Sequence, residues 1–195
     1  MNPKTSLLLI LFVMLTVQQT KASDGERKGF IFGFGLGSGI LSIDNDIDGR
    51  GFFATGKESK IPFVSNSKIG YAPSNRLLIY WSGKASWFGM TNAKDEKTFV
   101  TAGTGALTAS YFLKPKSPSL FFSAGLGYSN WTMPFEVDEE PWYGFGLFAG
   151  AGYEFVEHLY IEGGISWGNP SNESNGVSSK SNNLLMFITV NFLSY

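Results

Sequence analysis

The feature that most constrains this chain is an alternation, with a period of two residues, between apolar side chains and small or polar ones. Successive side chains of a β-strand point to opposite faces, so each alternating segment predicts a strand with one apolar face. Eight segments of 11 to 17 residues show the pattern. They are Lys28 to Ile43, Ile61 to Ala72, Arg76 to Met90, Lys97 to Leu113, Ser119 to Trp131, Tyr143 to Phe155, His158 to Gly168 and Asn183 to Tyr195.

The predicted connections differ in length in a regular way. Three are short, namely Pro73 to Asn75, Lys114 to Pro118 and Val156 to Glu157. Four tend to be longer and polar, namely Asp44 to Lys60, Thr91 to Glu96, Thr132 to Trp142 and Asn169 to Asn182. Short turns at one end and longer loops at the other are typical of an up-and-down barrel in an outer membrane.

The chemistry of the two strand faces favours a membrane barrel over a secreted β-sandwich. In the first segment Phe30, Phe32 and Phe34 alternate with Gly33 and Gly35. A sandwich would turn the aromatic face inward and leave a glycine-rich face in water, whereas a small barrel would turn the aromatic face to lipid. The glycine face would then line a lumen that we expect to be too narrow for large side chains. The sequence therefore predicts an all-β, transmembrane, antiparallel, up-and-down eight-stranded β-barrel.

The N-terminal residues have the pattern of a secretory signal peptide. A basic Lys4 precedes the apolar run from Leu7 to Val17, and Ala22 supplies a small residue for cleavage. We therefore predict a signal peptide over residues 1–22 and a barrel domain over residues 23–195. The remaining chain has no apolar run of the ~18 residues that a transmembrane helix needs. With 15 Lys and Arg against 16 Asp and Glu, and no cysteine, the composition argues against nucleic-acid binding and a disulfide scaffold.

Aromatic residues near the predicted strand ends suggest two interfacial girdles. Tyrosine and tryptophan favour membrane–water interfaces, because one part of each ring system is apolar and another forms hydrogen bonds. The expected outer girdle contains Trp87, Trp131, Trp142, Tyr143 and Trp167. The expected periplasmic girdle contains Tyr71, Tyr111, Tyr153, Phe155 and Tyr195.

Four charged residues fall on the face that the barrel would turn inward. They are Lys68, Lys84, Glu154 and Glu162. Unpaired charges inside a barrel are costly, so we expect these four to form one salt-bridged network that narrows any pore. The alternative is that some of them lie at a wet rim without a partner.

Other candidate chemistry is sparse. Asp44, Asp46 and Asp48 have the spacing of the first half of a calcium loop, but Thr55 stands where such a loop needs glutamate, so a solvated acidic loop is the simpler interpretation. The single histidine, His158, is placed at a short turn with no serine nearby in sequence. A hydrolase needs its base beside a nucleophile, so we expect no enzyme, no cofactor and no firm metal site.

The chain resembles the eight-stranded outer-membrane barrel superfamily, which includes the OmpA transmembrane domain, OmpX and OmpW. The resemblance rests on the signal peptide, the eight alternating segments and the aromatic-ended terminal segment from Phe187 to Tyr195. It implies contact with outer-membrane lipid and lipopolysaccharide, and recognition of the last strand by the barrel-assembly machinery. It also implies a structural or surface-interaction role, with an unknown surface ligand. The alternatives are a narrow channel for small solutes, as in OmpW-like proteins, and a lipid A-modifying enzyme.

Overall fold

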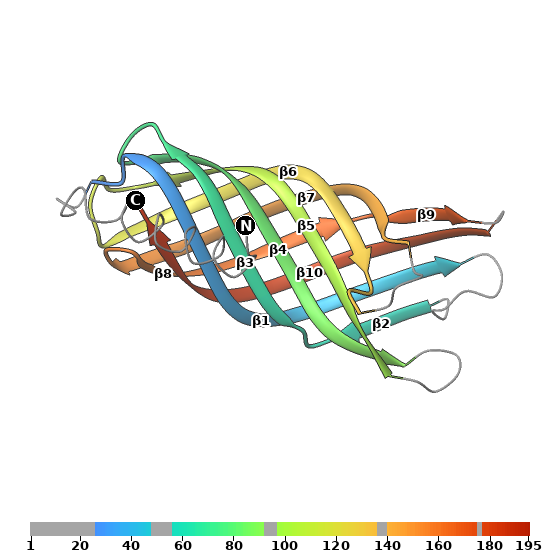
Figure 1. The fold of residues 1–195 in the computed structure, drawn as a ribbon. Helices are drawn as coiled ribbons and strands as arrows, with labels where there is room; N and C mark the ends of the chain where they lie inside the picture. Colours follow the sequence, from blue (N-terminus) through green and yellow to red (C-terminus); the bar gives the residue numbers. More distant parts are fainter. Residues whose placement is uncertain (1–25, 48–55, 92–96, 136–139, 175–176) are drawn as a thin grey trace, which may run out of the picture.

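The computed structural model describes residues 26–47, 56–91, 97–135, 140–174 and 177–195, and these residues form antiparallel strands (Figure 1). Their bounds are β1 Gly29–Ile47, β2 Gly56–Lys60, β3 Phe63–Ala72, β4 Leu77–Thr91, β5 Lys97–Phe112, β6 Ser119–Thr132, β7 Trp142–Val156, β8 Leu159–Gly168, β9 Ser171–Ser174 and β10 Val177–Ser194. In the described part of the chain there is no helix long and apolar enough to cross a membrane. The predicted signal peptide, residues 1–22, lies outside the described residues.

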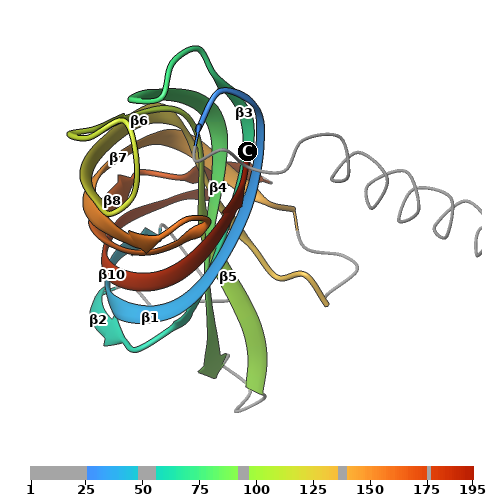
Figure 2. The same ribbon diagram turned by 90° about the vertical axis from the view of Figure 1, so that its left-hand side faces the viewer.

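Eight of these strands close into a ring, because β1 pairs with β3 on one side and with β10 on the other. Figure 2 looks into this ring from the end that carries the short turns. Two strands of the ring continue through an interruption: β2 and β3 keep one register along β1, and β9 and β8 keep one register along β10. Pro62 and Pro170 lie at the two interruptions, where a residue without an N–H cannot donate to the ladder. The eight predicted strands are therefore confirmed.

The loops predicted over Asp44 to Lys60 and Asn169 to Asn182 are partly strand, so those two boundaries were wrong. The strand β1 runs on to Ile47 because β10 pairs with it as far as Ile47 and β2 pairs with it as far as Asn45. Asp44 and Asp46 consequently lie in an extended strand, opposite Asn182 and Lys180 of β10, and not in a loop that wraps an ion. Asp48 lies outside the described residues.

The apolar faces of the strands point outward, as the alternation predicts. Phe30, Phe34, Leu107, Leu126 and Val190 are each more than half exposed, although they lie on four different strands of the ring. An exposed apolar surface that runs around a whole ring is unsuited to water and typical of a barrel whose outside meets hydrocarbon. A closed ring also leaves no unpaired strand edge, which a lipid environment requires.

Candidate functional site

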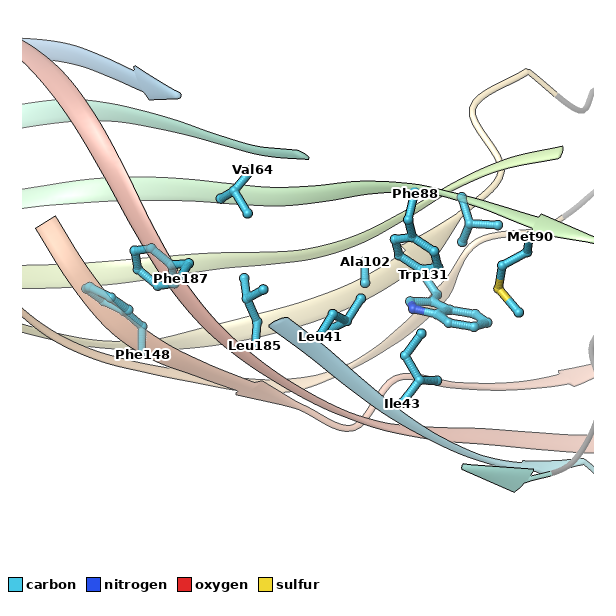
Figure 3. Close-up of a cluster of buried hydrophobic side chains, with 11 residues drawn as sticks. Leu41, Ile43, Val64, Phe88, Met90, Ala102, Trp131, Phe148, Leu185 and Phe187 are labelled. Atoms are coloured by element: carbon cyan, nitrogen blue, oxygen red, sulfur yellow. The ribbon is translucent and has the colours of Figure 1, made fainter. Parts of the chain in front are cut away.

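The lumen of the barrel is filled by side chains in three layers. The layer nearest the short turns is the turn-end cluster, which consists of Ile31, Ala72, Leu78, Tyr80, Phe112, Phe121, Tyr160 and Leu193. The layer nearest the long connections is the loop-end cluster (Figure 3), which consists of Leu41, Ile43, Val64, Phe88, Met90, Val100, Ala102, Trp131, Phe148, Leu185 and Phe187. Charged and amide side chains form a polar layer between the two clusters.

Large rings inside the barrel contradict the expectation that the lumen is too narrow for them. The glycines of the inward face explain the difference, because they give the rings space. A methyl group built on Gly164 would lie 3.0 Å from the rings of both Phe148 and Phe187, and one built on Gly152 would overlap the Phe121 ring. The inward face therefore combines glycines with aromatic residues, which together fill the interior closely.

The polar layer is organised around the carboxylate of Glu162 on β8. Lys68 Nζ donates to Glu162 Oε2 at 2.7 Å, and Asn66 Nδ2 donates to the same oxygen at 3.2 Å. Ser123 Oγ donates to Glu162 Oε1 at 3.0 Å. Asn66 also donates to Asn191 Oδ1 at 2.9 Å, which links β3 to β10. Every one of these side chains is buried, so the bonds replace water that the carboxylate loses on folding.

The predicted network of four charges is not formed as one unit. Lys68 and Glu162 form an ion pair, whereas Glu154 pairs with Arg27 near the short turns. Lys84 forms no ion pair within the described residues, and its Nζ lies 3.5 Å from the centre of the Phe148 ring. The expectation was wrong because alternation tells which side chains point inward but not the height at which each of them lies. The loop-end cluster gives Lys84 an aromatic neighbour in place of a carboxylate.

A second set of polar contacts ties together the turn end of the barrel. Arg27, buried just before β1, forms an ion pair with Glu154 of β7 and donates to the backbone oxygens of Asn75 and Lys114 at 3.0 and 2.9 Å. Tyr195 Oη donates to Glu154 Oε1 at 3.1 Å. Burial, followed by the negative charge of Glu154, raises the pKa of the Tyr195 phenol to about 12, which keeps the phenol protonated as a donor. We call these contacts the Arg27 cap.

His158 lies beside the Arg27 cap, and its contacts stabilise the fold of the chain there. Its backbone has a φ of 70°, and its Nδ1 donates to the carbonyl oxygen of Leu193 at 2.8 Å. Its ring lies 4.5 Å from the Tyr195 ring, measured between centroids. The hydrogen bond to Leu193, the ring contact with Tyr195 and the turn at His158 together hold the last residues of β10 in place.

Comparison with known proteins identifies the fold of this chain. No family model matches the chain, and no curated protein matches it. The solid-state NMR structure of outer membrane protein AlkL in DMPC lipid bilayers superposes with a TM-score of 0.50 at 10% identity, covering 89% of this chain and 94% of that one. The chain has the fold of an eight-stranded outer-membrane β-barrel.

Two further structures are similar to this outer-membrane barrel fold. The attachment invasion locus protein Ail of Yersinia pestis, in complex with sucrose octasulfate, has a TM-score of 0.48 at 14% identity and covers 84% of this chain and 99% of that chain. The outer membrane protein OprG of Pseudomonas aeruginosa has a TM-score of 0.48 at 12% identity and covers 88% of this chain and 98% of that chain.

The aromatic residues of this outer-membrane barrel divide between the outside and the lumen. Outward-facing members of the predicted girdles include Tyr71, Tyr111, Tyr143 and Tyr153, all exposed, and Phe155, also exposed. Trp87 and Trp167 are half-buried and donate through Nε1 to Ser65 Oγ at 2.9 Å and Asn182 Oδ1 at 2.6 Å.

Three residues assigned to the girdles point inward, which corrects the prediction. Trp131 is 2% exposed and belongs to the loop-end cluster, and Trp142 packs against that cluster with 5.4 Å between the two ring centroids. Tyr195 turns into the Arg27 cap. The alternation did indicate the direction of Trp131. It lies an even number of residues from the inward Ser123 and Ser129, and an odd number from the outward Tyr128, so it shares the face of the two serines.

Several residues of the barrel interior were missed by sequence reasoning. Asn66 and Ser123 stand on the inward face but carry no charge, so nothing singled them out as partners of Glu162. Asn191 could have been recognised, because it lies four residues before Tyr195, on the same face of the strand, and a polar amide on that face indicates an inward side chain. Nothing in the pattern pointed to Arg27, which precedes the first strand.

Proposed function

We propose that the chain is an integral outer-membrane barrel with a structural or surface-interaction role, and that its lumen is closed to solutes. The observation that carries the proposal is the filling of the lumen by two apolar clusters with a hydrogen-bonded polar layer between them. Apolar packing at both ends excludes water, and water is what a conducting path requires. The Arg27 cap adds a further barrier at the turn end.

The surroundings of such a barrel follow from its surface. Lipid would contact the exposed apolar belt, and lipopolysaccharide would surround the loop end, where β1, β5 and β10 extend beyond the loop-end cluster. The barrel-assembly machinery would read β10, whose outward alternation runs through Ile188, Val190 and Phe192. These three partners belong to the proposal.

A surface role is supported by exposed aromatic side chains at the loop end. Phe99 and Phe135 are 59% and 72% exposed, and their rings meet edge to face with 6.3 Å between centroids. Two exposed rings that pack together at the loop end offer an apolar contact surface for another molecule. A non-catalytic role is part of the proposal and is supported by the contacts of His158, whose ring nitrogen is engaged by a backbone oxygen.

Two measurements test the proposal. The outer-membrane fraction is run on an SDS gel with and without boiling, and the unboiled protein should migrate faster because a closed barrel resists SDS when cold. The purified protein is then reconstituted into a planar bilayer, where we expect no stepwise conductance. A soluble protein without a heat-dependent shift on the gel would refute the membrane barrel. Reproducible channel openings would refute the closed lumen and show that the barrel is a narrow channel. Unchanged lipid A masses in cells with and without the gene are expected if the role is non-catalytic.

A further inference from the structure

The charge inside the barrel is not balanced. The polar layer and the loop-end cluster contain two lysines, Lys68 and Lys84, and one carboxylate, Glu162. The carboxylate is already engaged by Lys68, Asn66 and Ser123. Lys84 is 3% exposed, and no hydrogen-bond partner lies within reach of its Nζ in the described residues. Lys84 therefore lies buried with no carboxylate paired to it.

The aromatic neighbours of Lys84 compensate its charge only in part. Its Nζ lies 3.5 Å from the centre of the Phe148 ring and 5.8 Å from that of Phe187. A ring face attracts a cation but accepts no conventional hydrogen bond. The three N–H donors of the ammonium group remain unsatisfied, and burial of an unsatisfied charged donor is strongly unfavourable.

A small cavity adjoins Lys84. Its volume is about 20 Å³, and its polar lining consists of Lys84, Ser86, Thr104, Ser129, Ser166 and Asn183. Its apolar side includes Leu41, Ala102 and Leu185 of the loop-end cluster, which are labelled in Figure 3. A volume of this size holds one water-sized guest and excludes a polyatomic ion such as sulfate.

The lining of the cavity is rich in donors and contains no carboxylate. Ser86 Oγ is buried without a hydrogen-bond partner, as Lys84 Nζ is, and the two side chains lie on the same face of β4. Thr104 Oγ1 and Ser166 Oγ lie 2.7 Å apart and share a hydrogen bond, and Ser166 Oγ also donates to the carbonyl oxygen of Leu147 at 3.4 Å, so both hydroxyl hydrogens are engaged. The donors without a partner on Lys84 and Ser86, beside a small cavity that has no carboxylate in its lining, favour an anion.

We propose that this cavity binds a single monatomic anion, chloride in the cell, which neutralises Lys84 inside the barrel. The anion accepts hydrogen bonds from Lys84 Nζ and Ser86 Oγ and stands in for the missing carboxylate. Water alone would satisfy the donors but would leave the positive charge uncompensated. The site is independent of the proposed function, since it requires only the folded barrel.

Bromide is the probe that tests the site, because it resembles chloride in charge and shape and is visible by anomalous diffraction. The full-length protein is refolded from urea in sodium bromide, so that the ion enters before the barrel closes, and then crystallised. We expect one anomalous peak in the cavity, within hydrogen-bond distance of Lys84 Nζ. The Lys84→Met variant, refolded in the same way, should lose the peak. A cavity that holds only water in the wild type, or a peak that persists in Lys84→Met, would overturn the proposal.

A solution measurement covers the case in which Lys84→Met does not fold. The thermal unfolding midpoint is compared in sodium bromide and in sodium gluconate at equal ionic strength, since gluconate is too large for the cavity. Bromide should raise the midpoint of the wild type in a saturable manner, and Ser86→Ala should need a higher bromide concentration for half of the effect. The control Lys114→Met removes an exposed lysine and should respond as the wild type does. Equal midpoints in the two salts for the wild type would refute the anion site.

Discussion

Lys68 and Glu162 are 94 residues apart in sequence, yet their side chains form an ion pair of 2.7 Å across the lumen, between β3 and β8. The two strands are not neighbours in the ring, so the pair spans the interior and fixes how opposite walls face each other. The Lys68 ammonium group also lies 4.8 Å from the centre of the Tyr160 ring and 5.3 Å from that of Tyr80. The pair thus joins the polar layer to the turn-end cluster.

Replacing Lys68 by methionine should weaken the barrel strongly. The substitution leaves Glu162 buried without its cation, and breaking a buried pair from one side costs about 3–5 kcal/mol. The free energy of unfolding is measured by urea titration in detergent micelles, with the unboiled gel band as the readout. The matched control is Lys57→Met, which removes the cation of the exposed pair with Asp44, where Lys57 is 82% exposed. That change should cost about 0–1 kcal/mol, and equal losses in both variants would contradict the role assigned to Lys68.

The neighbouring glycines of β8 should respond differently to alanine. A methyl group on Gly164 would lie 2.7 Å from the backbone oxygen of Ala149 and 3.0 Å from the Phe148 and Phe187 rings, whereas one on Gly163 has its nearest contact at 3.6 Å. We expect Gly164→Ala to destabilise the barrel by about 1–3 kcal/mol, because it overpacks the lumen. Gly163→Ala should unfold at the same urea concentration as the wild type or slightly above it. A Gly164→Ala protein as stable as Gly163→Ala would show that the two rings and the Ala149 backbone have room to move.

The Arg27 cap should behave as a coupled unit. Arg27→Met leaves Glu154 buried without a cation, and Glu154→Leu leaves Arg27 without an anion, so each should cost about 3–5 kcal/mol. The double variant should lose clearly less than the sum of the two, because neither charge then remains unpaired. Urea titrations of the four proteins form the cycle. Additive losses would mean that the two side chains act independently.

An outward charge in the middle of the belt should oppose membrane insertion. Leu126 is 62% exposed and lies on β6, between Leu107 of β5 and Leu147 of β7 in the strand register. Leu126→Arg should cost about 2–4 kcal/mol in phospholipid vesicles if this position lies near the bilayer midplane. Phe135→Arg, beyond the loop-end limit of β6, is the control and should cost about 0–1 kcal/mol. Folding yields in vesicles, compared by unboiled gel, distinguish the two, and an unimpaired Leu126→Arg would contradict a lipid-facing belt.

Much of the architecture is readable in local patterns. Alternation identified the strands of the ring and the direction of side chains such as Phe30 and Leu126, because strand geometry alone determines which face a residue occupies. The same alternation, applied as far as the strand ends, also predicts that Trp131 and Trp142 point inward. The loop boundaries were harder to predict, since β1 extends to Ile47 only through pairing with β10 and β2.

The sequence by itself determined which strand residues face the lumen, since that is a property of each strand taken alone. It did not determine which of them meet. In the structure Lys68 forms an ion pair with Glu162, Glu154 forms one with Arg27, and Lys84 lies beside the Phe148 ring. The height of each inward residue along the barrel depends on the tilt and stagger of all the strands when the ring closes, and only the tertiary structure sets that relationship.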